Sequence, residues 1–593
     1  MAAFRRAGQG AGTSAAVLTR AADALRAVDP AAALSFARRA VAAGETDPEA
    51  HNILGVVLWD GGDPAGAAAA FARAVALAPD DARFHANLAA AHRDLHDVAK
   101  AIQGYRDALE RDPGNADALN GLGTLLQRRG QAAAAIDHYR RALTIRPDDA
   151  QAVGNLATAL LETGDQAAAE ALSARALALA PDDPGVASNH LYGLHYLGRL
   201  TPDAMVAEHR RVVAPWLRPA PPYANDRTPD RRLRVGYVSP DFRDHPVARF
   251  LLPMLARHDP SQVELFAYAS GSQNDAVTTR LRQAMPQWRE IRALDDDRAA
   301  TIIAGDGIDV LVDLAGHTAS NRLPLFARAP APVQVTWLGY PGTTGLSSFV
   351  ARVVDAITDP PGNETQASEP LARIAGGFLA FDPLVPLPDP GPAPSIAAGH
   401  VTFGAFSNLA KITDEVIDRW SEILQTVGDA RLFMKARALR DPAIREATVA
   451  RFAGRGIDAS RLTLTGFRPG SDHHADQRLV DIALDPFPYN GTTTTCEALW
   501  MGVPVVTLAG DRHAARVGAS ILTHVGLPDL IADTPGGYVE TAVALARDPA
   551  RRAHLRATLR ERCRQSPLGD GARLASEMEA LYRRLWRDWC TRA

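Results

Sequence analysis

The residues best suited to chemistry lie between a predicted strand and a predicted helix. The strand ends at Asp485, a turn rich in proline and glycine follows, and four threonines at 492–495 begin the helix. The first N–H groups of a helix have no partner inside it, and they carry the positive end of the helix dipole. Threonine hydroxyls add further donors, so this helix start suits the diphosphate of a nucleotide. Glu497, one turn further on, could accept hydrogen bonds from a ribose diol. A single threonine is enough for an ordinary helix cap, so the run of four favours a phosphate-binding site.

A lysine that could neutralise such a diphosphate follows an earlier predicted strand. Only three of the 64 basic residues are lysines, Lys100, Lys411 and Lys435, and the rest are arginines. Lys411 lies in the polar turn after the predicted strand 401–407. A lysine ammonium is a compact point charge, unlike the guanidinium fork of arginine. We therefore interpret Lys411 as the partner of a leaving diphosphate, and we predict no function for Lys100 on its repeat surface.

The sequence lacks the signatures of several common catalytic centres. It has no GxGxxG, no Walker A and no HExxH motif, which are the signatures of dinucleotide redox chemistry, ATP hydrolysis and zinc proteolysis. The acidic run 295–297 precedes a predicted helix, where aspartate is a usual N-cap, so we interpret it as a cap and not as a metal site. His473 and His474 have no third ligand at metal-binding spacing. The expected site uses neither a metal nor a cofactor.

The composition indicates a soluble globular protein. The 593 residues are 47% hydrophobic and 22% charged, and the net charge of −4 provides no basic field for nucleic acid. This length corresponds to about four structural units. No apolar run reaches about 18 residues, which a membrane-spanning helix needs, and residues 1–16 lack the apolar segment of a signal peptide. The three cysteines cannot form a disulfide framework. These features predict a cytoplasmic protein that binds neither nucleic acid nor membranes.

The N-terminal part of the chain repeats with a period of 34 residues. Prolines at 79, 113, 147 and 181 share this spacing, as do alanines at 67, 101, 135 and 169 and aromatic residues at 71, 105 and 139. This period, with small residues where two helices cross, resembles the tetratricopeptide repeat. We predict repeats over residues 14–182, the first of them degenerate, that form an α superhelix with a groove for protein or peptide partners. Copies of the chain could also associate through the repeats.

Beyond a helical and proline-rich transition at 183–230, short β-branched runs alternate with helical segments. One set of predicted strands covers 233–239, 263–270, 310–316, 333–339 and 352–358, and a second set, after a proline-rich linker at 381–394, covers 401–407, 431–435, 462–466, 482–485 and 503–508. Such alternation is typical of parallel sheets covered by helices on both faces. We predict two Rossmann-like lobes, 231–395 and 396–593, the second closed by a helix at 574–589. Ligands bind beyond the carboxyl ends of parallel strands, so both lobes should face one site.

Four segments together resemble the O-GlcNAc transferase family, which includes the SPINDLY-type enzymes of plants and bacteria. They are residues 234–246, 331–345, 401–413 and 484–504, and the resemblance covers the repeats and residues 231–590. Members of this family join a tetratricopeptide superhelix to a two-lobed GT-B glycosyltransferase. The resemblance implies an enzyme that transfers a sugar from a nucleotide donor to serine or threonine hydroxyls of a protein acceptor, with inversion and without a metal.

The resemblance also implies catalytic residues. Asp241 and His245 match the active-site acid and histidine of the family, and Lys411 matches its diphosphate lysine. A serine hydroxyl is a poor nucleophile, so its proton must be removed directly or through water. Either Asp241 or His245 could do this, and His245 could instead position the sugar by a hydrogen bond.

Further matches concern the donor. They are Gly339 and Pro341 at the sugar, Asn408 where the family often has glutamine, His473 on the nucleobase, Thr492, Thr493 and Thr494 at the phosphates, and Glu497 where animal enzymes have aspartate at the ribose.

Departures from the animal pattern bear on the identity of the donor. Animal-type members have a histidine where this chain has Thr492, and here Cys496 and Glu497 follow the threonines. These features, like residues 408–413, are closer to the SPINDLY branch, some of whose enzymes use GDP-fucose. The main prediction is protein O-glycosylation with N-acetylglucosamine from UDP-GlcNAc. The alternatives are protein O-fucosylation from GDP-fucose and a non-enzymatic repeat scaffold.

Overall fold

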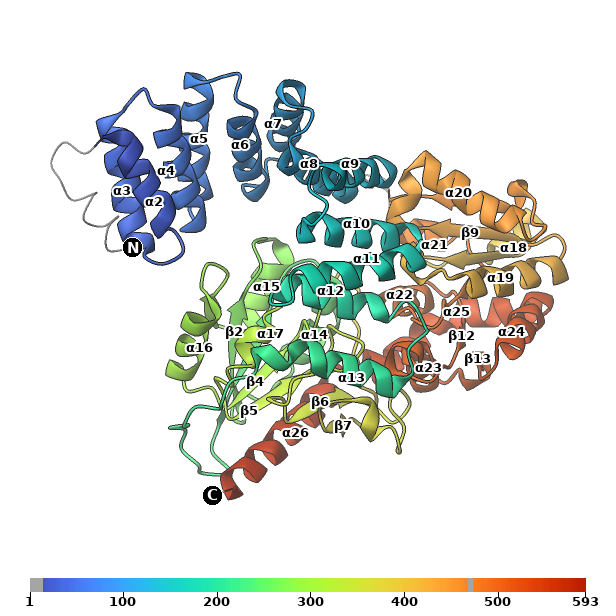
Figure 1. Ribbon diagram of the computed structural model, residues 1–593. Coiled ribbons are helices and arrows are strands. Elements are labelled where there is room, and N and C mark those ends of the chain that lie inside the picture. The colour runs from blue at the N-terminus through green and yellow to red at the C-terminus, as the bar shows by residue number, and fades with distance from the viewer. Residues whose placement is uncertain (1–13, 468–472, 593) are drawn as a thin grey trace. The chain divides into compact units, whose positions relative to one another are not determined.

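The computed structural model describes residues 14–467 and 473–592 (Figure 1). The chain divides into two compact units, one ending at Ala159 and the other beginning at Leu160. This division falls inside the helix α10 (Ala150–Thr163), so the last repeat helices belong to the same unit as the two sheets. The repeat boundary predicted at 182 stays a prediction.

Paired helices build the first unit. Those described before α10 are α2 (Ala15–Leu25), α3 (Pro30–Ala43), α4 (Pro48–Asp60), α5 (Pro64–Leu77), α6 (Ala82–Asp94), α7 (Val98–Arg111), α8 (Ala116–Arg128) and α9 (Ala132–Ile145). Side chains such as Asp63 and Asn115 accept a backbone N–H at the helix starts. Glycine lets paired helices approach, because a methyl group on Gly55 would lie 2.6 Å from the Phe71 ring. The predicted repeats are confirmed, and the degenerate first repeat is a regular helix pair.

A parallel sheet of seven strands forms the first lobe within the described residues. Its strand order is β3-β2-β1-β4-β5-β6-β7. The strands are β1 (Leu233–Ser239), β2 (Val263–Ala269), β3 (Gln287–Glu290), β4 (Val310–Asp313), β5 (Val333–Thr336), β6 (Ala351–Val354) and β7 (Leu371–Arg373). The described helices of this lobe include α14 (Pro246–Leu255), α15 (Ala276–Ala284), α16 (Asp296–Gly305) and α17 (Leu323–Phe326). All five predicted strands are confirmed, and the edge strands β3 and β7 are additional.

A second parallel sheet, with six strands among the described residues, forms the other lobe. Its order is β10-β9-β8-β11-β12-β13. The strands are β8 (Thr402–Ala405), β9 (Arg431–Lys435), β10 (Leu462–Thr465), β11 (Ile482–Leu484), β12 (Val505–Leu508) and β13 (Ile531–Ala532). The described helices include α19 (Asp414–Thr426), α20 (Pro442–Ala453), α22 (Thr493–Trp500), α23 (Val517–His524), α24 (Pro535–Arg547) and α25 (Pro549–Gln565). Two parallel sheets with helical connections confirm the predicted two-lobed architecture.

The final helix, α26 (Gly571–Thr591), leaves the second lobe and packs on α14 of the first (Figure 1). Its Glu579 carboxylate accepts a hydrogen bond from His258 Nδ1 at 2.8 Å, and the Tyr582 hydroxyl lies 3.2 Å from that of Tyr237. A final helix is therefore confirmed, but it packs on the first lobe, although the sequence predicts that residues 574–589 belong to the second. No helix in the described part of the chain is both long and apolar enough to cross a membrane.

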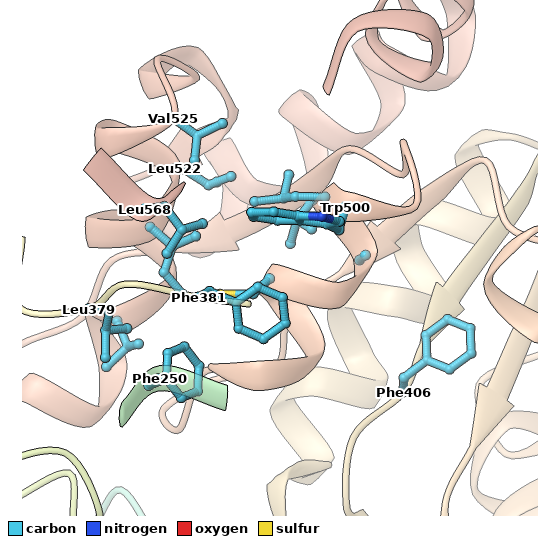
Figure 2. Close-up of a cluster of buried hydrophobic side chains, with 14 of the residues drawn as sticks. Phe250, Leu379, Phe381, Phe406, Trp500, Leu522, Val525 and Leu568 are labelled. Carbon is cyan, nitrogen blue, oxygen red and sulfur yellow. The ribbon is translucent and has the colours of Figure 1, made fainter. Parts of the chain in front are cut away.

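The two lobes share one hydrophobic core. Figure 2 shows Phe381, from the segment between the sheets, beside Phe250 of α14 and Trp500 of α22. Its ring centre lies 5.3 Å from each of those two rings. Phe381 is buried, so the predicted linker 381–394 begins as part of the core and not as an exposed connection. Burial of an aromatic ring between lobes favours one relative position of the two sheets.

Candidate functional site

The carboxyl ends of the neighbouring strands β8 and β11 bring the predicted diphosphate groups together. The two strands are paired, with Ile482 opposite Phe403. The turn after β8 carries Lys411, whose ammonium donates a hydrogen bond to the Asn490 carbonyl oxygen at 2.7 Å. The ammonium also lies 3.9 Å from the centre of the Tyr489 ring. Both contacts are to the turn that leads into α22, so Lys411 lies beside the turn that precedes the threonine run.

The start of α22 has no side-chain cap. Thr492 is the N-cap residue, and its side chain makes no capping hydrogen bond. Thr492, Thr493 and Thr494 are half-buried, whereas Thr495 is buried. The backbone N–H groups of the first helical turn have no acceptor within the helix. Together with the threonine hydroxyls they form a cluster of donors at the positive end of the helix dipole.

A buried carboxylate behind this helix start fixes the turn. Asp485 accepts hydrogen bonds from the Gly491 N–H at 2.6 Å and from the Thr507 hydroxyl at 2.7 Å. A Cβ on Gly491 would lie only 2.6 Å from the Thr495 hydroxyl oxygen, so the close approach requires glycine. Burial raises the pKa of Asp485, while the two donors and the Lys411 ammonium lower it. Burial lowers the pKa of Lys411, and the Asp485 carboxylate opposes that shift.

Asp241 and His245 lie beyond the carboxyl end of β1. The Asp241 N–H donates to the Ser239 hydroxyl oxygen at 2.9 Å, and Arg243 donates to the Asp241 carboxylate at 3.2 Å. His245 is the N-cap of α14. Its Nδ1 accepts a hydrogen bond from the Val247 N–H at 3.4 Å and lies 3.6 Å from Asp241 Oδ2. Asp241 is buried, whereas the His245 side chain keeps 30% of its surface exposed. The imidazole therefore has better access to a substrate than the carboxylate behind it.

Burial also determines the charge of this imidazole. It lowers the pKa of His245 below the ordinary 6.5, and the Asp241 carboxylate only partly offsets that shift. Arg243 and Arg249 lower the same pKa further, whereas Asp244 raises it. The ring is thus neutral at pH 7, which is the form that can accept a proton.

An ion pair joins the two lobes beside these groups. Arg249 of α14 binds the Glu497 carboxylate of α22, and His474 Nε2 lies 3.9 Å from the same carboxylate. Glu497 is buried. Its predicted contact with a ribose stays a prediction, and the structure adds a partner that sequence reasoning missed. Residues four apart share one face of a helix, so the spacing from His245 to Arg249 was the signal that could have revealed it.

The loop after β5 holds Gly339 and Pro341. A Cβ on Gly339 would lie 2.0 Å from the Leu314 carbonyl oxygen, so only glycine fits there. Leu338 has a positive φ of 81°, a backbone conformation that L-residues rarely adopt. Pro341 is half-buried. β5 is adjacent to β4, which is adjacent to β1, so this loop and Asp241 follow the same edge of one sheet.

Comparison with family models shows the family to which the chain belongs. The model described as glycosyl transferase family 41 matches residues 213–384 and 395–578, which include both lobes and more than half of the chain. The chain belongs to glycosyl transferase family 41. Tetratricopeptide-repeat models match residues 18–82, 86–150 and 126–188. This member of family 41 therefore carries repeats before its two α/β lobes.

Individual relatives of the family 41 chain carry names that agree with this assignment. A tomato (Solanum lycopersicum) SPINDLY protein, named a probable UDP-N-acetylglucosamine–peptide N-acetylglucosaminyltransferase, is 40% identical over 413 residues, 68% of this chain and 44% of the relative. The Caenorhabditis elegans UDP-N-acetylglucosamine–peptide N-acetylglucosaminyltransferase is 26% identical over 532 residues, with 68% and 46% covered. A solved mutant of the Thermobaculum terrenum O-GlcNAc transferase matches with a TM-score of 0.81 and 37% identity, covering 86% of this chain and 98% of that one. The chain spans less than half the length of these two curated relatives.

The helix α21 (His473–Gln477) carries the residue predicted to pack on the nucleobase in this family 41 protein. The His473 side chain lies outside the described residues, so that prediction stays open. The third lysine, Lys435 at the end of β9, is buried and binds the Asp476 carboxylate of α21 at 2.5 Å. Its rarity among the basic residues was a signal that it has a specific partner. Asn408 is exposed, and its side chain accepts the Ala410 N–H at 3.3 Å, which caps the short turn that carries Lys411.

The acidic run 295–297 caps a helix, as predicted. The Asp295 carboxylate accepts the Arg298 N–H at 2.8 Å at the start of α16. Asp296 and Asp297 are paired with arginines, Arg322 and Arg328. Within residues 14–467 and 473–592, no three histidine, cysteine, aspartate or glutamate side chains form a group that could hold a metal ion.

Proposed function

We propose that this glycosyltransferase transfers N-acetylglucosamine from UDP-N-acetylglucosamine to serine or threonine hydroxyls of proteins, with inversion at the anomeric carbon and without a metal. The observation that carries the proposal is the meeting of the Lys411 ammonium with the uncapped start of α22 at the carboxyl ends of β8 and β11. The names of the relatives and of the Thermobaculum terrenum structure support the choice of donor.

Lys411 and α22 stabilise the leaving nucleoside diphosphate. When the bond to the sugar breaks, negative charge grows on the diphosphate oxygens. The Lys411 ammonium, the N–H groups at Thr493 and Thr494 and the threonine hydroxyls are positioned before the reaction, so no reorganisation is needed as charge develops. The contact between Lys411 and the Asn490 carbonyl oxygen holds the ammonium beside the turn.

His245 accepts the proton of the acceptor hydroxyl on its neutral imidazole ring. The Asp241 carboxylate, whose Oδ2 lies 3.6 Å from Nδ1, stabilises the imidazolium that forms. The exposed part of the His245 side chain and its lowered pKa favour this role over proton removal by the buried Asp241. The hydroxyl oxygen then attacks the anomeric carbon from the side opposite the departing diphosphate, which inverts its configuration.

The repeats bind the protein acceptor. In the first unit, the Asn87 side chain donates to Asn52 Oδ1 at 2.8 Å, and Asn155 donates to Asn120 Oδ1 at 2.9 Å. These amides recur in successive repeats and are half-buried or buried. A side-chain amide both donates and accepts hydrogen bonds, so such a row suits the backbone of an extended peptide, whatever its sequence.

The test is transfer from a panel of nucleotide sugars to a mixture of serine- and threonine-containing proteins, read by mass spectrometry. UDP-N-acetylglucosamine should give a mass increase of one N-acetylhexosamine on hydroxyl residues. Addition of a deoxyhexose from GDP-fucose alone would replace the proposed donor but keep the reaction class. Binding of donors without transfer or hydrolysis would overturn the enzymatic proposal in favour of a scaffold.

A further inference from the structure

A buried hydroxyl lies at the centre of the loop that carries Gly339 and Pro341. Tyr340, between them, is buried, and its hydroxyl lies 2.9 Å from His195 Nε2 and 2.7 Å from His209 Nε2. Neither histidine belongs to the sheet that carries the loop. His195 ends helix α12 (Pro184–Leu194), and His209 lies in α13 (Pro202–Val213). The two helices follow α11 (Gln166–Leu179), the last predicted repeat helix.

The hydrogen bonds at Tyr340 have one direction only. His209 Nδ1 lies 2.7 Å from the Met205 carbonyl oxygen and must donate to it, so Nε2 of the neutral ring must accept from the Tyr340 hydroxyl. The hydroxyl oxygen in turn accepts from His195 Nε2–H. Burial lowers the pKa of His209 to about 4, so this ring is neutral at pH 7. The Leu191 carbonyl oxygen of α12 lies 3.4 Å from the hydroxyl as a further, longer contact, and together these groups hold the hydroxyl in place.

A second histidine contact attaches the other end of the loop to α12. His317 Nε2 lies 2.8 Å from the Thr344 carbonyl oxygen and must donate to it, so Nδ1 accepts from the Ser188 hydroxyl at 3.1 Å. Both side chains are buried. Burial lowers the pKa of His317 to about 3, which keeps this ring neutral as well.

The loop fits against the two helices without room for a methyl group. A Cβ on Gly342 would lie 2.4 Å from His195 Cε1, and one on Gly345 would lie 2.7 Å from the His209 backbone. On the opposite side, Gly339 is pressed against the Leu314 carbonyl oxygen. The backbone of the loop is therefore held between its own sheet and the helices that follow the repeats.

We infer that His195 and His209 are positioning residues for the donor sugar, which act through the Tyr340 hydroxyl on the backbone of Gly339 and Pro341. The inference rests on the proposed function and on the family resemblance, which implies that Gly339 and Pro341 lie at the sugar of the nucleotide donor. Helices α12 and α13 are then part of the donor site and not only a connection between the repeats and the lobes.

The inference predicts that recognition of the sugar can be impaired without any change in recognition of the nucleotide. The loop belongs to the first lobe, whereas the diphosphate cradle belongs to the second. Loss of the Tyr340 hydroxyl should weaken the recognition of the sugar and leave the affinity for UDP unchanged. General destabilisation of the protein would lower both.

The experiment is Tyr340→Phe, which removes one oxygen atom and keeps the ring. Calorimetry should show a Kd for UDP within twofold of that of the unsubstituted protein and a weaker Kd for UDP-N-acetylglucosamine. Since two hydrogen bonds are lost, kcat/KM for transfer should fall about tenfold or more. Tyr237→Phe is the matched control, because its buried hydroxyl contacts Tyr582 at 3.2 Å, outside the proposed site, and it should leave both quantities unchanged.

A second pair of variants tests the partner of the hydroxyl. His209→Leu removes the acceptor and should reproduce the Tyr340→Phe defect, whereas the amide oxygen of His209→Gln can accept the same hydrogen bond and should restore part of the activity. The double variant Tyr340→Phe/His209→Leu should be no worse than the more impaired single variant, because both remove one interaction.

Three results would overturn the inference. They are unchanged affinity for the nucleotide sugar in Tyr340→Phe, an equal loss of affinity for UDP and its sugar, and fully additive effects in the double variant. If the unsubstituted chain bound UDP-N-acetylglucosamine but transferred nothing, the proposed function would fail, and the two calorimetric affinities would still decide the positioning role.

Discussion

Replacement of Lys411 by alanine should reduce turnover by about 10² to 10³-fold, the usual effect of losing one preorganised charge-stabilising donor. Coulomb's law gives the scale for an ammonium in contact with the diphosphate. At an effective dielectric constant of about 20, two unit charges about 4 Å apart interact by about 4 kcal/mol. If about half a unit of charge has developed on the diphosphate at the transition state, the loss is about 2 kcal/mol, and each 1.4 kcal/mol is about tenfold in rate. A loss of about 2 kcal/mol alone is about thirtyfold. A hydrogen bond lost from a charged donor contributes about 1.5 kcal/mol or more, which brings the expected loss to about 10² to 10³-fold.

The assay is steady-state release of UDP together with transfer to a protein acceptor. Lys100→Ala is the matched control, because that lysine is exposed on α7 and paired with Asp97 at 3.0 Å. It should behave as the unsubstituted protein does. Lys411→Arg keeps the charge, but the Asn490 carbonyl at 2.7 Å and the Tyr489 ring at 3.9 Å surround a single ammonium, so its activity should lie closer to that of alanine.

Stability must be measured alongside turnover. Lys411→Ala leaves the buried Asn490 carbonyl oxygen without its lysine donor, and an unpaired buried group costs about 1–3 kcal/mol of stability. Thermal unfolding should still show a folded protein at the assay temperature. Turnover within fivefold of the unsubstituted protein in a folded Lys411→Ala variant would refute the role of this lysine at the leaving group.

Three further outcomes are expected. The acidic limb of kcat/KM against pH should lie below pH 6.5, because burial lowers the pKa of His245 and only its neutral form accepts a proton. Asp241→Asn removes the carboxylate that raises this pKa, so it should move the limb to still lower pH. An unmoved limb would exclude His245 as the titrating base. Transfer should survive EDTA, since Lys411 and the start of α22 offset the diphosphate charge; loss on chelation and recovery with Mg²⁺ or Mn²⁺ would contradict the proposed mechanism. A chain that begins at residue 160, the start of the second compact unit, should hydrolyse the donor as the whole chain does but modify whole proteins poorly. If this fragment is soluble and modifies proteins as well as the whole chain does, the first unit has no role in acceptor binding.

Local patterns in the sequence determined the architecture. The 34-residue period reflects contacts between helices that are neighbours along the chain, so it can be read without knowledge of the fold. The same holds for the diphosphate cradle, in which a strand, a turn and a helix start follow one another directly. The meeting of Lys411 with that cradle was also predictable, because carboxyl ends of parallel strands lie at one edge of a sheet.

The sequence pattern did not predict three short edge strands. β3, β7 and β13 all lie at the edges of their sheets and were not predicted. An edge strand has one hydrogen-bonded neighbour and one open side, so it is short and need not show a continuous apolar run. β3, for example, consists of Gln287, Trp288, Arg289 and Glu290. Its backbone is extended because β2 supplies the hydrogen-bonding partners, which is a property of the sheet.

Only the tertiary structure decided the partners of the buried polar groups. The sequence shows that Glu497, Lys435 and Tyr340 exist, and burial requires that each have a partner. The partners are Arg249, Asp476 and the pair His195 and His209, all of them distant in the sequence. A buried charge or hydroxyl is satisfied by whichever group the packing of helices and sheets places beside it. For this reason the chemistry of the proposed diphosphate site could be predicted from a contiguous motif, whereas the contacts of α12 and α13 with the loop that carries Tyr340 required the folded chain.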